Sequence, residues 1–362
     1  MKIAQIAPLA ESCPPKLYGG TERVVSFLTE ELVDQGHEVT LFASGDSVTA
    51  AELVPCSERA LRLSPGPVDA LPYHMILLEE VARRAQEFDA LHFHIDLMHA
   101  PVVRAFAHKT LTTLHGRLDL PGLAPFYRAF PRLPLISISD SQRLPMPPVN
   151  WVKTIYHGLP RDLLTFQPRV NNGYFAFLGR ISPEKRPDRA IEIAARAGMP
   201  LKIAAKIDRV DQAYWDECIE PLVKAHPNIE YIGEIADHQK SEFLGGATAL
   251  LFPIDWEEPF GLVMIEAMAC GTPVIAFRRG SVPEVMEHGV TGFIVDTVDE
   301  AVAAAHHIQT LDRARVRQRF EQRFTVERMA RDYVDTYRRN EGLEARTLPV
   351  SGVTEVASHV AA

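Results

Sequence analysis

Short apolar segments of strand type alternate with helical patterns along almost the whole chain, and this alternation constrains the fold more than any other feature. A strand is predicted at 2–8, and the helix after it keeps apolar residues at helical spacing from Val24 to Val33. Further strands are predicted at 39–43, 90–94, 110–114, 135–139, 152–156, 174–178, 201–205, 229–232, 250–253, 274–277 and 293–295. Most are apolar on both faces, as buried strands of parallel sheets are. The sequence therefore predicts an α/β protein built from βα units.

A break in this pattern divides the chain into two series. Residues 159–172 contain two prolines, two adjacent asparagines and no regular period, which is typical of a domain boundary. We expect an N-terminal domain at 1–160, a linker at 161–172, a second domain at 173–324, a C-terminal helix at 325–341 and a flexible tail at 342–362. Ligands of doubly wound sheets bind at the carboxyl ends of the strands. We therefore expect a site in the cleft between two Rossmann-like domains.

Charge and cysteine usage exclude several classes of protein. The net charge of −9 disfavours nucleic-acid binding, because phosphate contacts need a basic face. No apolar run approaches the about 18 residues of a membrane-spanning helix, and the N-terminus has no secretory pattern. The cysteines lie far apart, which argues against a zinc site or a disulfide framework and fits a reducing compartment. They are Cys13, Cys56, Cys218 and Cys270. These features predict a cytoplasmic protein.

The segment 255–274 carries the strongest chemical pattern. Pro259 suits the first position of a helix, which places Glu258 at the mouth of that helix. Free amides at a helix N-terminus form a site for an anion such as a diphosphate. They are expected here at Phe260, Gly261 and Leu262. Glu266 is predicted about 80° around the helix from Glu258 and roughly 12 Å along it. Two such carboxylates can bind hydroxyl groups on either side of a diphosphate; the alternative is ordinary acidic residues at a helix start and on an exposed face.

Two cations follow the first strand of the second domain. Arg180 and Lys185 stand in the run Gly-Arg-Ile-Ser-Pro-Glu-Lys. At the carboxyl end of a strand they can meet a diphosphate and stabilise the negative charge of a leaving group. An ordinary basic loop is the alternative.

Together these motifs resemble the retaining glycosyltransferases of family 4, which have the two-domain GT-B fold. The Glu-x7-Glu element of the family reads as residues 258–266 here, and its Gly-Arg-x4-Lys element as residues 179–185. The runs at 280–285 and 289–295 also match in order and spacing. The resemblance covers nearly the whole chain before the expected tail.

The resemblance implies a role for each matching residue. Glu258 contacts the hexose of the donor, Glu266 its ribose, and Arg180 and Lys185 its diphosphate. In the N-terminal domain, Gly19 and Gly20 resemble a glycine loop that lets the backbone approach donor and acceptor, and His115 matches the histidine of the catalytic centre.

The chain departs from the family at two places. Gly116 follows His115 where many members have aspartate, so the acceptor contact usually made there is not carried over. Residues 204–208 lack the glycine-rich strand end found near the base in many members, so this segment does not identify the nucleotide. Lys206 in this segment is either a further donor contact or a plain surface lysine.

The resemblance implies no metal and no cofactor besides the nucleotide sugar as co-substrate. His92, His94 and His99 lie close in sequence, and imidazoles are common metal ligands. However, the chain has no further ligand cluster and no Asp-x-Asp motif. We expect His94 to line the cleft and His92 to be a core or surface histidine.

Residues 121–134 mix aromatic side chains with arginines. This segment is either a packed loop with a solvated basic rim or a contact for an anionic acceptor or the inner face of a membrane.

The sequence predicts a cytoplasmic retaining glycosyltransferase that moves a hexose from a nucleoside diphosphate sugar, taken to be UDP-glucose, to a hydroxyl group of an unidentified acceptor. A sugar phosphorylase or a nucleotide-sugar epimerase of the same fold is an alternative. A sugar-binding protein without catalysis is a further one. A dehydrogenase is disfavoured because no Gly-x-Gly-x-x-Gly follows the first strand.

Overall fold

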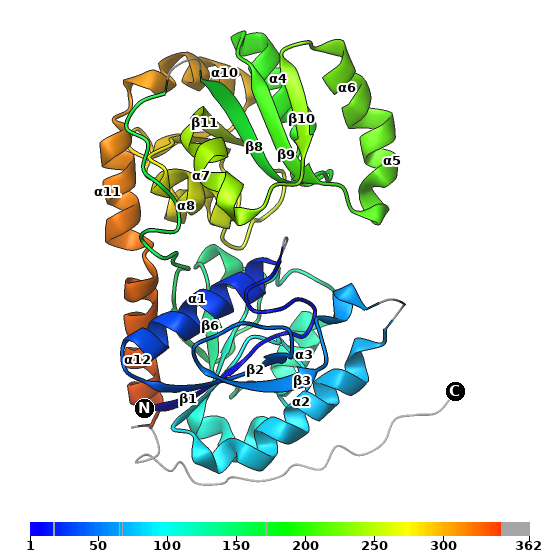
Figure 1. Ribbon diagram of the computed structural model, residues 1–362, viewed down its shortest axis with the longest axis vertical. Helices are drawn as coiled ribbons and strands as arrows, with labels where there is room; N and C mark the ends of the chain where they lie inside the picture. The colour runs from blue at the N-terminus through cyan, green and yellow to red at the C-terminus, as the bar shows by residue number, and fades with distance from the viewer. Residues whose placement is uncertain (17–18, 65, 67, 171–172, 342–362) are drawn as a thin grey trace.

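The computed structural model describes residues 1–16, 19–64, 66, 68–170 and 173–341. Two parallel sheets, each flanked by helices, form two lobes, as Figure 1 shows. The predicted α/β class with two doubly wound sheets is confirmed. The tail expected at 342–362 and residues 171–172 of the expected linker lie outside the described residues.

Seven strands form the sheet of the N-terminal lobe, in the order β3-β2-β1-β4-β5-β6-β7. They are β1 Lys2–Ile6, β2 Glu38–Ser44, β3 Glu52–Ser57, β4 Ala90–Phe93, β5 Thr110–Thr113, β6 Leu135–Ser137 and β7 Trp151–Thr154. Strand β3 was not predicted. It lies at the edge of the sheet, is mostly half-exposed and contains Pro55, so the apolar pattern of a buried strand is missing.

Helices cover this sheet. They are α1 Gly20–Asp34, α2 Ala70–Arg84 and α3 Leu123–Ala129, with 3-10 turns at Leu61–Leu63, Ala85–Glu87, Val103–Lys109 and Ser141–Arg143. Helix α1 buries Val24, Val25, Leu28 and Leu32, which repeat at helical spacing. Its first residue, Gly20, directly follows a loop at the carboxyl end of β1, so the helix begins at the edge of the sheet that faces the second lobe (Figure 1).

Six strands form the sheet of the C-terminal lobe, in the order β10-β9-β8-β11-β12-β13. They are β8 Tyr174–Arg180, β9 Leu201–Lys206, β10 Ile229–Gly233, β11 Ala247–Phe252, β12 Val274–Phe277 and β13 Gly292–Val295. The helices are α4 Pro187–Ala197, α5 Gln212–Tyr214, α6 Glu220–Ala225, α7 Asp237–Gly245, α8 Leu262–Ala269, α9 Val282–Val285, α10 Val298–His307 and α11 Arg313–Arg323. A π-helical turn, Trp215–Ile219, joins α5 to α6, and 3-10 turns span Arg209–Asp211 and Ile308–Thr310.

The last helix, α12 Val326–Glu341, returns to the N-terminal lobe and lies beside α1 (Figure 1). Its side chains Met329, Tyr333 and Tyr337 are almost completely buried in the core that contains Ile3. The predicted stripe of apolar and aromatic residues on this helix is therefore its packing face. The chain crosses between the lobes twice, and the core of the N-terminal lobe includes helix α12, which is distant in sequence.

The two sheets turn the carboxyl ends of their central strands toward each other. In the first sheet the strand order reverses at β1 and β4, and in the second it reverses at β8 and β11. The loops that leave these strands diverge at such a point and leave a crevice for a ligand. Most of the predicted site residues follow strands or lie at the start of a helix at these two edges, and Glu266 lies within α8.

Candidate active site

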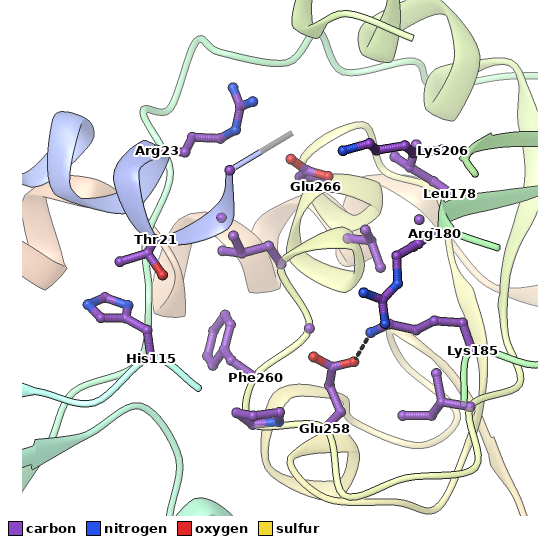
Figure 2. A pocket seen from close by; sticks show the side chains of 18 of the residues that line it. Thr21, Arg23, His115, Leu178, Arg180, Lys185, Lys206, Glu258, Phe260 and Glu266 are labelled. Carbon is purple, nitrogen blue, oxygen red and sulfur yellow. Dashed lines mark hydrogen bonds and ion pairs between the residues drawn. The ribbon is translucent and has the colours of Figure 1, made fainter. Parts of the chain in front are cut away.

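A cleft of about 690 Å³ lies between the two lobes, and both contribute to its walls. Every residue that the sequence assigned to the site lines it. They are Gly19, Gly20 and His115 from the first lobe, and Arg180, Lys185, Glu258, Phe260, Gly261, Leu262 and Glu266 from the second. Figure 2 shows His115 and Phe260 on one side of this space and Arg180, Lys185 and Glu258 on the other. The structure thus brings together residues up to 247 positions apart (266 − 19 = 247).

The two lobes approach each other at the start of α1. A Cβ atom added to Gly20 would lie 3.7 Å from Cδ1 of Leu262, at the start of α8 in the other lobe. A Cβ atom on Gly19 would lie 2.8 Å from Cβ of Pro15, so this position has room only for glycine. The glycine pair lies in the cleft wall, and its approach to donor and acceptor stays a prediction.

Arg180 is the last residue of β8, and carboxylates surround it. Its guanidinium forms an ion pair with Glu184 and lies 3.8 Å from Asp208 and 3.5 Å from Asp211. Lys206, at the end of the neighbouring strand β9, forms an ion pair of 2.9 Å with Asp208. Both cations line the cleft. Their charge can therefore act on a bound anion while the acidic residues hold the side chains in place.

Lys185 and Glu258 form an ion pair at the floor of the cleft (Figure 2). The ammonium group also lies 4.7 Å from the ring centroid of Trp256 and 5.8 Å from that of Phe252, within the range of a cation–π interaction. Glu258 is 8% exposed. A buried carboxylate needs such a partner, and Lys185 supplies it for Glu258.

The start of helix α8 corrects one prediction. The helix does not begin at Pro259 but at Leu262, and Gly261 is its N-cap with a φ of +78°. In this left-handed conformation the helix cannot extend backward through Gly261. The amide of Met264 already donates to the carbonyl of Gly261 at 3.0 Å. Leu262 and Val263 thus supply the first amides of the helix, and Phe260 and Gly261 lie before it.

This start also changes the relation between the two glutamates. Glu258 lies in the loop before α8, so the predicted angle and rise between Glu258 and Glu266 along one helix do not apply. Both side chains nevertheless line the cleft, on either side of the start of α8. In Figure 2 they point into the same space from its two ends.

Glu266 belongs to a charged network that the sequence did not predict. Its carboxylate lies 2.7 Å from Nζ of Lys240, which lies 3.1 Å from Asp237. Asp237 also forms an ion pair with Arg23 of helix α1 in the other lobe. Burial lowers the pKa of Arg23 and the nearby Glu266 raises it. Helix α7, which carries Asp237 and Lys240, had no clear sequence pattern, so no signal pointed to these two residues.

A group of histidines occupies the N-terminal wall. Nε2 of His115 lies 2.8 Å from Nδ1 of His94, and the ring of His157 stacks on that of His115 with centroids 5.2 Å apart. Burial lowers the pKa of His115 to about 3, and it lowers the pKa values of His94 and His157 well below their usual range. These side chains are therefore neutral at physiological pH.

The predictions for the other histidines have different outcomes. His92 is a core residue, as predicted, with its ring nitrogens 2.7 Å from Tyr337 Oη and 2.7 Å from Thr113 Oγ1. His94, which we expected in the cleft lining, is buried behind His115. His157, to which the sequence assigned no role, does line the cleft. Among the described residues, no group of three or more His, Cys, Asp or Glu side chains is arranged to hold a metal ion.

Residues 121–134 include helix α3. Tyr127 is fully buried, and the ring centroids of Phe126 and Phe130 lie 4.8 Å apart. Arg128 and Arg132 are exposed. The aromatic side chains thus pack inward, which favours the packed loop with a basic rim, and the contact with an anionic acceptor or membrane stays a prediction. Within the described part of the chain, no helix has the length and apolar character needed to cross a bilayer.

Comparison with known proteins identifies relatives of this architecture. Two family profiles match, "Glycosyltransferase Family 4" over residues 18–143 and "Glycosyl transferases group 1" over residues 165–325. The chain is 26% identical over 341 residues to the N-acetyl-alpha-D-glucosaminyl L-malate synthase of Bacillus anthracis. This match covers 83% of this chain and 86% of that protein.

Two solved structures share the fold. The sucrose-phosphate synthase of Thermosynechococcus elongatus has a TM-score of 0.73 at 20% identity and covers 94% of this chain and 98% of its own. HepE of Anabaena, solved with UDP and glucose, has a TM-score of 0.69 at 20% identity and covers 93% of this chain and 99% of its own. The two-lobed architecture is that of GT-B glycosyltransferases.

Proposed function

We propose that this chain, which belongs to the glycosyltransferases of group 1 and family 4, transfers glucose from UDP-glucose to a hydroxyl group of an acceptor. Members of this family are retaining hexosyltransferases that use a nucleotide sugar. One observation carries the proposal: basic side chains and the free amides of α8 face one cleft, and a buried carboxylate lies at either side of them. A sugar nucleotide has the complementary order of hexose, diphosphate and ribose.

In this proposal each charged group has one part of the donor as its partner. Arg180, Lys185 and the amides of Leu262 and Val263 bind the diphosphate, because cations and a helix N-terminus both favour a phosphate. Glu258 accepts hydrogen bonds from the hexose and Glu266 from the ribose. Lys185 then shares its charge between Glu258 and the diphosphate, and Lys240 shares its charge between Glu266 and Asp237.

The reaction proceeds with retention at the anomeric carbon of the sugar. The oxygen of the acceptor hydroxyl forms a bond to this carbon while the bond to the β-phosphate oxygen breaks. The electron pair of the broken bond stays on UDP, and the proton of the acceptor passes to the departing phosphate oxygen on the same face of the sugar. Arg180 and Lys185 stabilise the charge that develops on that oxygen. His115, which lines the cleft from the N-terminal lobe, lies on the acceptor side.

The choice of UDP-glucose as the donor is supported by the ligands of a structural neighbour. HepE of Anabaena, with the same fold, has been solved with UDP and glucose and with UDP-glucose. The other relative, from Bacillus anthracis, is by its name a synthase that joins a glucosaminyl group to L-malate. The HepE structures support a UDP sugar as the donor, whereas the names of the relatives differ in the acceptor. We therefore propose the donor and leave the acceptor as a hydroxyl compound.

We also propose that the reaction takes place in the cytosol. The four cysteines are free thiols, and Cys13, Cys56 and Cys270 are buried. Free buried thiols are typical of proteins from a reducing compartment. Fractionation of the producing cell and a blot of the soluble and membrane fractions test this location.

The experiment that tests the function is the release of UDP from nucleotide sugars. UDP-glucose, UDP-N-acetylglucosamine and GDP-mannose are each incubated with the protein, first in water and then with a panel of hydroxyl acceptors. We expect UDP release from UDP-glucose, with the α-anomer of glucose formed first in proton NMR spectra. Absence of both binding and turnover for all three donors contradicts the proposal. Release of a sugar 1-phosphate that requires inorganic phosphate identifies a phosphorylase instead.

A further inference from the structure

A chain of buried hydrogen bonds leads from the cleft to the C-terminal helix. It begins at His115, where Nε2 lies 2.8 Å from Nδ1 of His94. Nε2 of His94 lies 2.8 Å from Oε1 of Gln5, and Nε2 of Gln5 donates to Tyr337 Oη at 3.2 Å. Gln5, His94 and Tyr337 are nearly inaccessible to solvent. Gln5 belongs to β1 and Tyr337 to α12, while His94 and His115 follow β4 and β5. Four elements therefore fix the position of the His115 ring.

The side-chain amide of Gln5 decides where the protons of this chain lie. Its oxygen faces His94, so Nε2 of His94 must carry a proton to donate to it. Nδ1 of the neutral His94 is then an acceptor, and Nε2 of His115 must carry the proton between the two rings. A neutral imidazole carries one proton, so Nδ1 of His115 has none.

The opposite orientation of the Gln5 side-chain amide would leave a buried N–H group without a hydrogen-bond partner. If the amide group of Gln5 is turned around, its NH2 group donates to Nε2 of His94, and Nδ1 of His94 carries the proton. Nε2 of His115 then accepts from His94, and His115 carries its proton on Nδ1. That nitrogen is buried and has no hydrogen-bond partner among the described residues. A buried N–H group without a partner is rarer in proteins than a buried acceptor without one. The orientation in the structure avoids the unpaired N–H group.

The surroundings keep this chain neutral. The ring of His157 stacks on His115, and Arg328 of α12 lies near His157. A second proton on His115 would place a positive charge beside the imidazoles of His94 and His157, and burial already disfavours that charge.

We propose that His94 and Gln5 are positioning residues that hold His115 as the tautomer with its proton on Nε2. Nδ1 of His115 is then kept as a hydrogen-bond acceptor for a hydroxyl group of a substrate. The proposal rests on the proposed function only in that last step, because the tautomer belongs to the protein without ligand. Tyr337 is the far anchor of the chain, which links the C-terminal helix to the reaction centre.

The tautomer is tested directly in the unliganded protein labelled with nitrogen-15 in histidine. Two-bond couplings between ring protons and ring nitrogens distinguish a protonated from an unprotonated nitrogen, and the signals of His115 are assigned by their loss in His115→Gln. We expect Nε2 to be protonated and Nδ1 not. A protonated Nδ1, or a charged ring at neutral pH, overturns the proposal even when the protein turns over no donor.

A matched pair of variants tests the consequence for turnover. In His94→Asn the side-chain oxygen takes the place of Nδ1 and still accepts from His115, whereas His94→Leu removes the acceptor. We expect His94→Leu to lower kcat for the release of UDP from UDP-glucose by roughly tenfold with little change in UDP affinity, and His94→Asn to restore most of it. Thermal unfolding establishes that both variants are folded. Equal kcat values in two folded variants overturn the positioning role, and if His94→Leu does not fold, the tautomer measurement still decides the proposal.

Discussion

The ammonium group of Lys240 lies 2.7 Å from the carboxylate of Glu266. Glu266 is 3% exposed, so Lys240 compensates a charge that burial would otherwise penalise. Because Lys240 also lies 3.1 Å from Asp237, which pairs with Arg23 of the other lobe, this contact joins the donor side of the cleft to the N-terminal lobe. Glu266 of the C-terminal lobe and Arg23 of the N-terminal lobe therefore belong to one charged network.

Substitution Glu266→Ala should weaken the binding of UDP. If Glu266 accepts hydrogen bonds from the ribose, its loss costs about 1.5–3 kcal/mol, or roughly tenfold to a hundredfold in Kd. Calorimetry with UDP and with UDP-glucose measures this change, and both ligands should be affected equally. Glu217→Ala, at an exposed position of the same lobe, is the matched control. Unchanged UDP binding in Glu266→Ala contradicts the assignment of the ribose to this residue.

Substitution Glu258→Ala should act on turnover instead. Glu258 is assigned to the hexose, which UDP lacks, and Lys185 keeps its contact with the ring of Trp256 when Glu258 is removed. We expect UDP affinity within about a factor of two of the wild type and a loss of kcat of at least roughly tenfold, since the sugar is no longer held in a reactive orientation. If UDP affinity falls as far as in Glu266→Ala, the two glutamates do not contact opposite ends of the donor.

Turnover should continue in excess EDTA. In the proposed reaction the developing charge on the leaving phosphate is stabilised by Arg180, Lys185 and the start of α8, which do the work that a divalent ion does in other transferases. The rate of UDP release is compared before and after EDTA treatment and after addition of Mg²⁺ or Mn²⁺. A loss of activity that either ion restores shows that the charge is stabilised by a metal.

Buried histidines should make the protein less stable in mild acid. Burial lowers the pKa of His99 to about 3, whereas an unfolded histidine has a pKa of about 6.5. Below the unfolded value only the unfolded chain takes up the proton, so the free energy of unfolding falls as the pH decreases from about 6.5 toward about 3. The contribution of His99 is up to about 1.4 kcal/mol per pH unit.

His99→Phe separates this contribution from that of the carboxylates. The ring of His99 stacks on Phe93 with centroids 4.3 Å apart, so an aromatic ring fits the site. The free energy of unfolding of the variant minus that of the wild type should increase by about 2 kcal/mol when the pH falls from about 7.5 to about 5. The reason is that the unfolded variant has no imidazole at this position to take up a proton. Unfolding curves at both pH values measure the gain. A difference between the two proteins that is the same at both pH values shows that His99 is not the titrating group.

The ion pair between Arg23 and Asp237 should limit the opening of the cleft. Asp237→Ala removes this contact between the lobes and leaves Lys240 paired with Glu266. We expect small-angle scattering to give a larger radius of gyration for the unliganded variant than for the wild type, and UDP-glucose to reduce the difference. Glu242→Ala, at an exposed position of the same helix, is the control. Equal radii for the two variants contradict a role of this ion pair in closure.

Much of the site was predictable because parallel strands end at a common edge. Gly19 and Gly20 follow β1, His115 follows β5 and Arg180 ends β8, so a correct order of βα units already places these residues near one cleft. The motif around Glu258 was predictable for the same reason. Its helix boundary was not, because the left-handed backbone of Gly261, where a Cβ atom would lie 2.8 Å from Met264, is set by packing.

The sequence by itself determined the α/β class, the two series of βα units and ten of the residues that line the cleft, because these follow from local periodicity, from strand direction and from the matched motifs. Only the tertiary structure decided the partners of those residues. Lys185 and Glu258 are 73 residues apart, His94 and Gln5 are 89 apart, and Gln5 and Tyr337 are 332 apart. Contacts of this kind depend on how two lobes and a returning helix pack, and no short stretch of sequence contains that information.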